Sequence, residues 1–157
     1  MRDYAEAVRL FELGNTVAGA LHGNLETLNA CVECCDRHVG GGKVALLHVD
    51  RDGHTARYSF EQLHMLAARF ANVLKAQGVQ VGDRVAGLLP RTPELLVSIL
   101  ATWRIGAVYQ PLFTAFGPKA IEHRLEQSRA CVVVTDSVNR GKLDDVHACP
   151  TVITVNA

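Results

Sequence analysis

The sequence predicts an α/β fold, made of parallel-sheet βαβ units with helices on both faces, plus an N-terminal β-hairpin. Residues 84–111 read as strand, turn, helix and strand, which is the pattern of one βαβ unit. A further amphipathic helix and strand-like run follow this unit, and two β-type runs joined by a short turn precede it. These three observations set the order of the predicted elements.

The central unit carries the clearest signals. The apolar run Val85–Leu89 does not alternate with polar residues, as in a strand covered on both faces, and Pro90 ends it. Pro93 suits the first position of a helix, and Gly106 allows the left-handed backbone that often ends one. Ala107–Gln110 is the second strand. Because a helix connects the two strands, they can lie parallel with a right-handed crossover.

A hairpin and a long helix are expected before this unit. Lys43–Val49 and His54–Tyr58 are β-type runs, and Gly53 in the turn between them can adopt the positive φ of a short hairpin loop. Ser59 and Gln62 form a capping box at the start of the next helix. The apolar stripe of that helix comprises Phe60, Leu63, Ala67, Phe70, Ala71 and Leu74, and Gly78 follows its end.

The chain divides into an N-terminal arm, residues 1–23, and an α/β subdomain, residues 24–157. The arm has weak helical periodicity followed by a glycine-dotted stretch. Asn24 is expected to cap a helix that ends at Gly40–Gly42 and carries Leu25, Leu28, Val32 and Cys35 on one face. After the central unit we expect a helix with Ile121 and Leu125 facing inward, a strand at Cys131–Thr135, a loop with a short helix over Asp136–Asp145, and a last strand at Thr151–Val155.

Composition narrows the functional classes. The 157 residues suffice for one compact core, and 16 basic against 16 acidic residues leave no net charge and no block of one sign. We therefore expect neither nucleic acid nor a membrane surface as a partner. No apolar stretch approaches the roughly 20 residues that span a bilayer, and the start lacks a signal peptide, which predicts a soluble cytoplasmic protein. Five cysteines are an odd count, so reduced thiols are expected.

One glycine-rich run and one cysteine–histidine pattern suggest binding sites, and each has a simpler explanation. The run Gly40–Lys43 resembles a phosphate loop, but it follows a helix and precedes a strand, whereas a phosphate cradle needs the opposite order. We interpret the glycines as a helix terminator. Cys31, Cys34 and His38 share one flank of a helix, but no fourth ligand with metal-binding spacing follows. Thiols packed as small hydrophobes beside a surface histidine are the expected arrangement.

Histidines and one basic loop complete the candidate chemistry. His48 and His54 flank the hairpin, where a cross-strand pairing is more plausible than a general base. His64 and His123 are expected on solvated helix faces. Arg140-Gly141-Lys142 follows the predicted strand ending at Thr135, and ligands of open α/β sheets collect outside the carboxyl ends of strands. This loop is either a phosphate site or a solvated charged turn.

Four stretches resemble the amino-terminal part of the AMP-forming acyl-CoA synthetases, which belong to the adenylate-forming superfamily. They are Tyr58–Leu63, Gly78–Val85, Pro90–Leu100 and Arg104–Phe113. The resemblance covers most of the chain from about residue 25 onward. Within the superfamily, Phe113-Thr114-Ala115-Phe116-Gly117-Pro118, followed by Ile121, Arg124 and Leu125, is most similar to the acetyl-, propionyl- and medium-chain acyl-CoA synthetases.

This resemblance implies a two-step ligase. A carboxylate and ATP give an acyl-adenylate and pyrophosphate, and coenzyme A (CoA) then takes the acyl group. ATP, CoA and Mg²⁺ are thus the cofactors implied for the full-length enzyme, with a short- or medium-chain acid as substrate. The family's phosphate loop, its Tyr-Gly-x-Thr-Glu segment, its ribose-binding Asp and its C-terminal lysine do not occur in these residues. The chain therefore resembles an N-terminal fragment that supplies no catalytic or metal-binding residue, should bind neither nucleotide tightly, and is inactive alone.

The resemblance also implies a group of CoA contacts. In the acetyl-CoA synthetases, the segment that matches Phe113–Gly117 lies near the CoA entrance, and an arginine-bearing loop meets the nucleotide phosphate. Phe113, Phe116, Gly117, Arg140 and Lys142 are the positions that could inherit these roles. The chain departs from the family at Thr114 and Ala115, which replace a glycine pair, and at Lys142, where an arginine is usual. The two phenylalanines could equally pack between helix and sheet.

A second functional class stays open at the level of sequence. A standalone, non-catalytic α/β binding or interaction module derived from the same fold would carry the same landmarks. The missing part of the ligase would leave sheet edges and apolar helix faces unpaired. We therefore expect that the chain can associate as a homo-oligomer through those surfaces, whether it is a ligase fragment or a standalone module.

Overall fold

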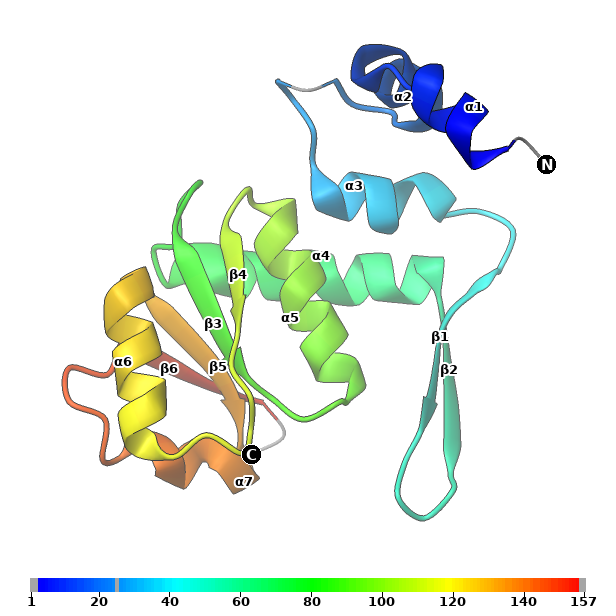
Figure 1. The fold of residues 1–157 in the computed structure, drawn as a ribbon. Coiled ribbons are helices and arrows are strands. Elements are labelled where there is room, and N and C mark those ends of the chain that lie inside the picture. The colour runs from blue at the N-terminus through cyan, green and yellow to red at the C-terminus, as the bar shows by residue number, and fades with distance from the viewer. Residues whose placement is uncertain (1–2, 25, 156–157) are drawn as a thin grey trace.

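The computed structural model describes residues 3–24 and 26–155 and confirms the α/β class (Figure 1). Helices and strands follow one another in the predicted order from the hairpin onward. The elements are α1 Tyr4–Arg9, α2 Leu13–Ala20, α3 Ala30–Cys34, η1 Asp36–His38, β1 Val44–Val49, β2 Thr55–Ser59, α4 Phe60–Ala76, β3 Arg84–Leu88, α5 Pro93–Arg104, β4 Val108–Pro111, α6 Pro118–Ser128, β5 Val132–Asp136, α7 Ser137–Arg140, η2 Gly141–Leu143 and β6 Thr151–Val155.

Four parallel strands form the main sheet in the order β4-β3-β5-β6. Strand β3 pairs with β4 on one side and with β5 on the other, so that Val85 lies opposite both Tyr109 and Val132. The chain leaves β3 through α5 toward β4 and then returns through α6 to the far side of β3 (Figure 1). This reversal of direction places α5 and α6 on opposite faces of the sheet, as predicted.

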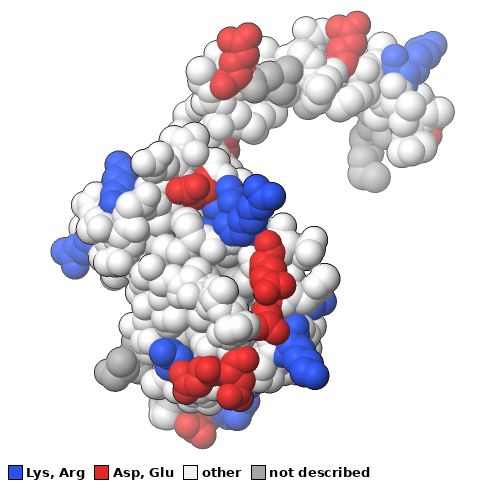
Figure 2. All heavy atoms as spheres, turned by 90° about the vertical axis from the view of Figure 1, so that its left-hand side faces the viewer, with Lys and Arg blue, Asp and Glu red and all other residues white. Residues whose placement is uncertain are grey.

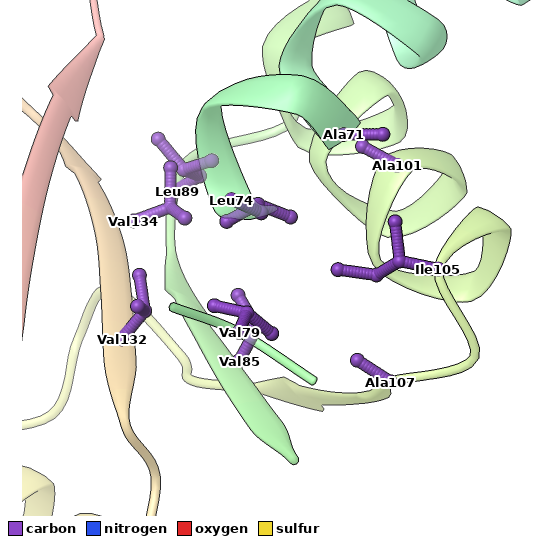
Figure 3. Packing of buried hydrophobic residues seen from close by; sticks show 10 residues of the cluster. All are labelled: Ala71, Leu74, Val79, Val85, Leu89, Ala101, Ile105, Ala107, Val132 and Val134. Atoms are coloured by element: carbon purple, nitrogen blue, oxygen red, sulfur yellow. The ribbon is translucent and has the colours of Figure 1, made fainter. Parts of the chain in front are cut away.

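Both faces of the sheet are packed, which explains the unbroken apolar run in β3. On one face, Val85 and Leu89 meet α4 and α5 in a cluster that also contains Leu74 and Ile105 (Figure 3). On the other face, Leu88 joins residues of α6 and the region of η2. That second cluster comprises Ala86, Leu88, Leu112, Ile121, Leu125, Val133, Leu143 and Val146. Since every residue of β3 after Arg84 is buried, none of them can be polar without a partner.

The hairpin and helix α4 form as predicted. β1 and β2 pair antiparallel, and Gly53 in the turn has a φ of 84°. The Ser59 side chain accepts from the backbone N–H of Gln62, while the Gln62 side chain accepts from the backbone N–H of Ser59, which completes the capping box. A third apolar cluster joins the hairpin to α3, α4 and α5, with Cys31, Cys35, Leu63, Ala67 and Leu100 at its centre.

The predicted start of the first subdomain helix is wrong. The helix α3 begins at Ala30, and its cap is Asn29, which accepts from the backbone N–H groups of Cys31 and Val32. Asn24 instead closes a local turn by accepting from Glu26 and Thr27, and Leu25 lies outside the described residues. Asn29 takes the cap because its amide also donates to the carbonyl oxygens at the end of α5, at 3.2 and 3.3 Å, a tertiary contact that no local pattern shows.

The N-terminal arm contains two short helices that stand away from the sheet (Figure 1). No residue of α1 is buried, and Tyr4 and Phe11 expose 82% and 59% of their surface. The glycine-dotted stretch that follows is largely the helix α2. Glu33 and Arg37 hold the exit of the arm, because the Glu33 carboxylate accepts from the backbone of residues 22 and 23 and Arg37 donates to the carbonyl of residue 20.

Two histidine predictions are also wrong. His48 lies opposite Ala56 rather than His54, because the strand register places His54 in the turn, where its Nδ1 is 2.9 Å from an Asp50 carboxylate oxygen. His64 is not simply solvated. Its Nδ1 lies 2.8 Å from Asp36 Oδ1, which also accepts from Arg104 at 2.5 Å. This cluster joins η1 to α4 and α5.

Within the described residues, no helix is long and apolar enough to cross a membrane. All five cysteines are free thiols, and burial raises the pKa of Cys31 to about 11. Figure 2 shows one face of the molecule, on which acidic and basic side chains lie interspersed. This arrangement agrees with the balanced composition.

Candidate functional site

The carboxyl ends of β3 and β4 open into a cavity of about 780 Å³. Its lining includes Leu89–Thr92 after β3, residues 111–114 at the end of β4, and His48–Arg51 at the end of β1 and in the hairpin turn. Gly87, Leu95, Phe116 and Arg124 complete the lining among the described residues. The cavity therefore lies at the edge where parallel α/β sheets bind their ligands, and its volume is that of a small-molecule site.

The two predicted phenylalanines both line this cavity. Their rings meet edge to face with centroids 5.7 Å apart. Phe116 is partly buried against the cluster below α6, whereas Phe113 exposes 63% of its surface. The Arg124 guanidinium lies 4.0 Å above the Phe116 ring centroid, a cation–π contact. Packing between helix and sheet thus accounts for Phe116, but it leaves the Phe113 ring available to a ligand.

Gly117 is the N-cap of α6, with an ordinary φ of −79°. Its carbonyl accepts from the backbone N–H groups of Ala120 and Ile121. A side chain added at this position would meet no atom within 4 Å, so the surface beside it is open. Gly117 does not line the cavity, but it directly follows the segment that does.

Arg140 lies at the end of α7, after β5, as the sequence predicted. One of its guanidinium nitrogens is 2.5 Å from an Asp144 carboxylate oxygen, and the two side chains expose 42% and 66% of their surface. An ion pair this exposed contributes little to stability, which leaves the guanidinium able to exchange its partner. Burial raises the pKa of the nearby Cys149 thiol, while the charge of Arg140 acts to lower it.

Lys142 has a different environment from Arg140. Its Nζ donates to the carbonyl oxygen of Thr114 and, at 3.1 Å, to the side-chain oxygen of Asn139. Lys142 is partly buried by these contacts. Of the five predicted residues, Phe113 and Phe116 line the cavity, Gly117 follows them in sequence, and Lys142 ties its own loop to their backbone. Arg140 and Lys142 are not among the described residues that line the cavity.

Sequence reasoning missed three cationic side chains that line the cavity, namely Arg51, Arg91 and Arg124. Arg51 and Arg91 are exposed and form no ion pair with another residue of the described part of the chain. Arg91 carried the signal that singled out Arg140, since it directly follows a buried strand. Arg51 in the hairpin turn carried none, because only the fold brings that turn to the end of β3.

The glycine run near residue 40 has an internal partner. The Glu61 carboxylate accepts from the backbone N–H groups of Gly40 at 2.7 Å and Gly42 at 3.3 Å. The Ser59 hydroxyl, the backbone N–H of Glu61 itself and these glycine N–H groups lower the pKa of Glu61 to about 2. The amides that a phosphate would need are therefore engaged by a carboxylate. The helix-terminator interpretation is wrong in position, because α3 ends at Cys34 and η1 at His38, so the glycines follow the helical segment without ending it.

One group of side chains in the described residues could meet a metal ion, and it lies in the hairpin turn. It consists of Asp50, Asp52 and His54, all exposed. Asp50 already accepts from the backbone of Asp52 and His54 and contacts the imidazole, so its oxygens serve the turn itself. The alternative metal set fails because Cys31 is fully buried, whereas Cys34 is exposed and His38 packs on Phe60.

Comparison of the sequence with known proteins shows to which family the chain is similar. Residues 35–157 match the model of the AMP-binding enzyme family. The acetyl-coenzyme A synthetase of Sodalis glossinidius is 36% identical over 99% of this chain, and that of Psychromonas ingrahamii is 44% identical over 73% of it. These matches cover 27% and 18% of the two relatives, so the chain spans about a quarter or less of their length.

Comparison with solved structures leads to the same family. The crystal structure of Brucella canis acyl-CoA synthetase has a TM-score of 0.95 and 51% identity, over 99% of this chain and 29% of that one. The structure of apo MatB from Rhodopseudomonas palustris has a TM-score of 0.68 and 33% identity, over 81% of this chain and 25% of that one. The matches extend from the arm to the last strand, and the chain belongs to the AMP-binding enzyme family.

Proposed function

We propose that this chain is the N-terminal part of an AMP-forming acyl-CoA synthetase that acts on a short- or medium-chain acid. The observation that carries the proposal is the extent of the similarity, since nearly the whole chain aligns with an acetyl-coenzyme A synthetase and superposes on an acyl-CoA synthetase. The cationic and aromatic cavity at the carboxyl edge of the sheet supports a ligand that combines phosphates with a ring system, as ATP and CoA do.

The proposed reaction has two steps. A carboxylate oxygen of the acid attacks the α-phosphorus of ATP, the bond from that phosphorus to the bridging oxygen breaks, and pyrophosphate leaves. The CoA thiolate then attacks the acyl carbonyl carbon, and AMP leaves. The first step is useful because AMP is a far better leaving group than oxide. Mg²⁺ would balance the phosphate charge in the first step.

Phe113, Phe116, Gly117, Arg140 and Lys142 are proposed as the CoA side of this site. The exposed ring of Phe113 offers a face on which a base can stack, and Arg140 can form charge-assisted hydrogen bonds to a phosphate. Open space beside Gly117 lets a ligand approach the backbone. Arg51 and Arg91 at the cavity add positive potential that attracts an anion.

The test uses the full-length ligase that carries this chain. Exchange of labelled pyrophosphate into ATP is measured with acetate, propionate, butyrate, hexanoate and octanoate, and thioester formation is measured after CoA is added. We expect exchange that depends on one of these acids and thioester that depends on CoA. If neither occurs with any acid, the ligase proposal fails.

The isolated 157-residue chain provides a second measurement. We propose that it is catalytically incomplete, because no catalytic group is assigned to it, and we expect no exchange and only weak binding of ATP in calorimetry. Tight ATP binding by the isolated chain would contradict this. If the chain is instead a non-catalytic binding module, it should bind a ligand, and the full-length protein should show no acid-dependent pyrophosphate exchange. The exchange and binding measurements together therefore separate the two functions.

A further inference from the structure

Two cationic side chains from different elements hold the segment Phe113–Phe116. Lys142 Nζ, from η2, donates to the carbonyl oxygen of Thr114 in the middle of the segment. Arg124, from α6, lies over the Phe116 ring at its end. Because the Phe116 ring contacts Phe113 edge to face, the position of the exposed Phe113 ring depends on both cations.

A hydrogen-bond network anchors Lys142 to the end of β5. The side-chain oxygen of Asn139 accepts from Lys142 Nζ at 3.1 Å. Asn139 is itself 94% buried, and its amide nitrogen and backbone N–H both donate to Asp136 Oδ1, at 2.8 and 2.7 Å. Asp136 is the last residue of β5. The network therefore ties the end of β5 to the segment that follows β4, on the other side of β3.

Lys142 and Arg140 differ in how readily their side chains can turn from their present partners to bind an anion. A lysine ammonium carries three donors, and Lys142 already gives two of them to protein acceptors, which fix the position of its nitrogen. Among the described residues, Arg140 pairs with the exposed carboxylate of Asp144, which a phosphate can replace at little cost. The two cations of one short loop thus differ in what they can do for a ligand.

We propose that Lys142 is a positioning residue for the CoA-dependent step. It fixes the backbone of Phe113–Phe116, so that the aromatic wall is in place before the ligand binds, and it leaves the direct phosphate contact to Arg140. Ordering this segment in advance lowers the entropy cost of binding. The proposal rests on the proposed function, because it requires CoA at this wall. Removing the Lys142 donor should therefore weaken use of CoA and spare adenylate formation.

A double-mutant cycle in the full-length ligase tests this role. Lys142→Met keeps the length of the side chain and removes its donors, and Phe113→Ala removes the ring that Lys142 positions. We expect Lys142→Met alone to lower kcat/KM for CoA roughly tenfold, and to lower it less than about twofold when Phe113 is already Ala. An equal loss in both backgrounds would mean that Lys142 contacts CoA directly. That result, or the absence of any loss, overturns the proposal.

Pyrophosphate exchange in the absence of CoA shows whether each variant is folded and forms the adenylate. It should be unchanged in the matched control Lys119→Met, which removes an exposed lysine from α6, and in the other variants the loss in kcat/KM for CoA is taken relative to their own exchange rate. If Lys142→Met abolishes exchange, Lys142→Gln replaces it in the cycle, because the amide keeps a donor. We expect Lys142→Gln to lower kcat/KM for CoA roughly threefold, and this loss must also vanish when Phe113 is already Ala. A wild-type protein without acid-dependent exchange would instead defeat the proposed function itself.

Discussion

At the residue scale, the hydroxyl oxygen of Tyr109 is buried and has no hydrogen-bond partner among the described residues. An added side chain at Gly87 would come within 1.9 Å of that hydroxyl, so the tyrosine ring occupies the space above the glycine. Burial raises the pKa of Tyr109 to about 12, against 10.0 for a free tyrosine. The fold therefore favours the neutral phenol, although it provides the oxygen with no hydrogen bond.

Replacing Tyr109 with Phe should be neutral or should stabilise the fold by about 0.5–1 kcal/mol, because it removes an unpaired buried polar atom. The effect should grow with pH. Since the pKa is higher in the folded state, the wild type is fully stable below pH 10 and loses stability as the pH rises toward 12, whereas the Phe variant lacks this loss. Urea unfolding at pH 8 and pH 11 measures both effects. A large loss at pH 8 would show that the hydroxyl has a partner.

Gly87 should not tolerate even a methyl group. The added carbon of Gly87→Ala would lie 1.9 and 2.6 Å from two atoms of Tyr109, so we expect destabilisation of about 1–3 kcal/mol. Gly141→Ala is the matched control, because Gly141 has an α-helical backbone and nothing within 4 Å. In a Tyr109→Val background the penalty at Gly87 should fall. Thermal unfolding of the wild type, the three single variants and the double variant would show whether the ring alone excludes a side chain.

At the element scale, one carboxylate holds the loop before β1 against the start of α4. Glu61 in the first turn of α4 accepts from the amides of Gly40 and Gly42, both of which have positive φ. The glycines thus serve two purposes, since they allow the left-handed backbone and they point their amides at one acceptor. The sequence showed the first purpose and could not show the second, because Glu61 lies beyond the hairpin.

Glu61→Gln should weaken the fold at neutral pH and have less effect in acid. The folded-state pKa of about 2 is below the ordinary 4.5, so the carboxylate stabilises the fold above pH 4.5 and loses this contribution as the pH falls toward 2. Unfolding measured between pH 7 and pH 3 should show the two proteins converging as the pH falls. A constant difference would assign the loss to packing rather than to charge.

At the scale of the whole molecule, the arm is attached to the subdomain mainly at its exit. The contacts of Glu33 and Arg37 hold residues 20–23, while α1 buries nothing. A chain that begins at Asn24 should therefore unfold cooperatively with a midpoint within a few degrees of that of the whole chain. It should also associate less in light scattering, because the exposed apolar side chains of the arm are gone. A large drop in the midpoint would show that the arm is part of the core.

Most elements of this fold could be predicted because their signals are local. The capping box at Ser59, the proline that opens α5 and the apolar run of β3 each act within a few residues. The cap of α3 was misplaced because Asn29 is selected by α5, which lies more than seventy residues away. The strand order was not predictable either, since no local pattern tells on which side of β3 the strand β5 will pair.

The candidate site also contains residues that could be predicted from the sequence and residues that only the fold reveals. The loop of Arg140 follows a strand and could be selected from that position, whereas Phe113 and Phe116 could be selected through the resemblance to the acyl-CoA synthetases. The partner of Lys142 could not, because the carbonyl oxygen of Thr114 is a backbone atom and leaves no trace in the residue type. Arg51 likewise became a cavity residue only when the hairpin turn met the end of β3.

The position of β3 inside the sheet has a consequence for synthesis on the ribosome. β3 emerges before both of the strands that pair with it, and β5 follows it only after α5, β4 and α6 have been made. During that interval one edge of this strand, which is buried from Val85 to Leu88 in the folded chain, has no partner, and such non-local pairing is slow. The α4 helix is already complete by then and can cover one face of the strand. The nascent chain is therefore most prone to aggregate between completion of β3 and the arrival of β5.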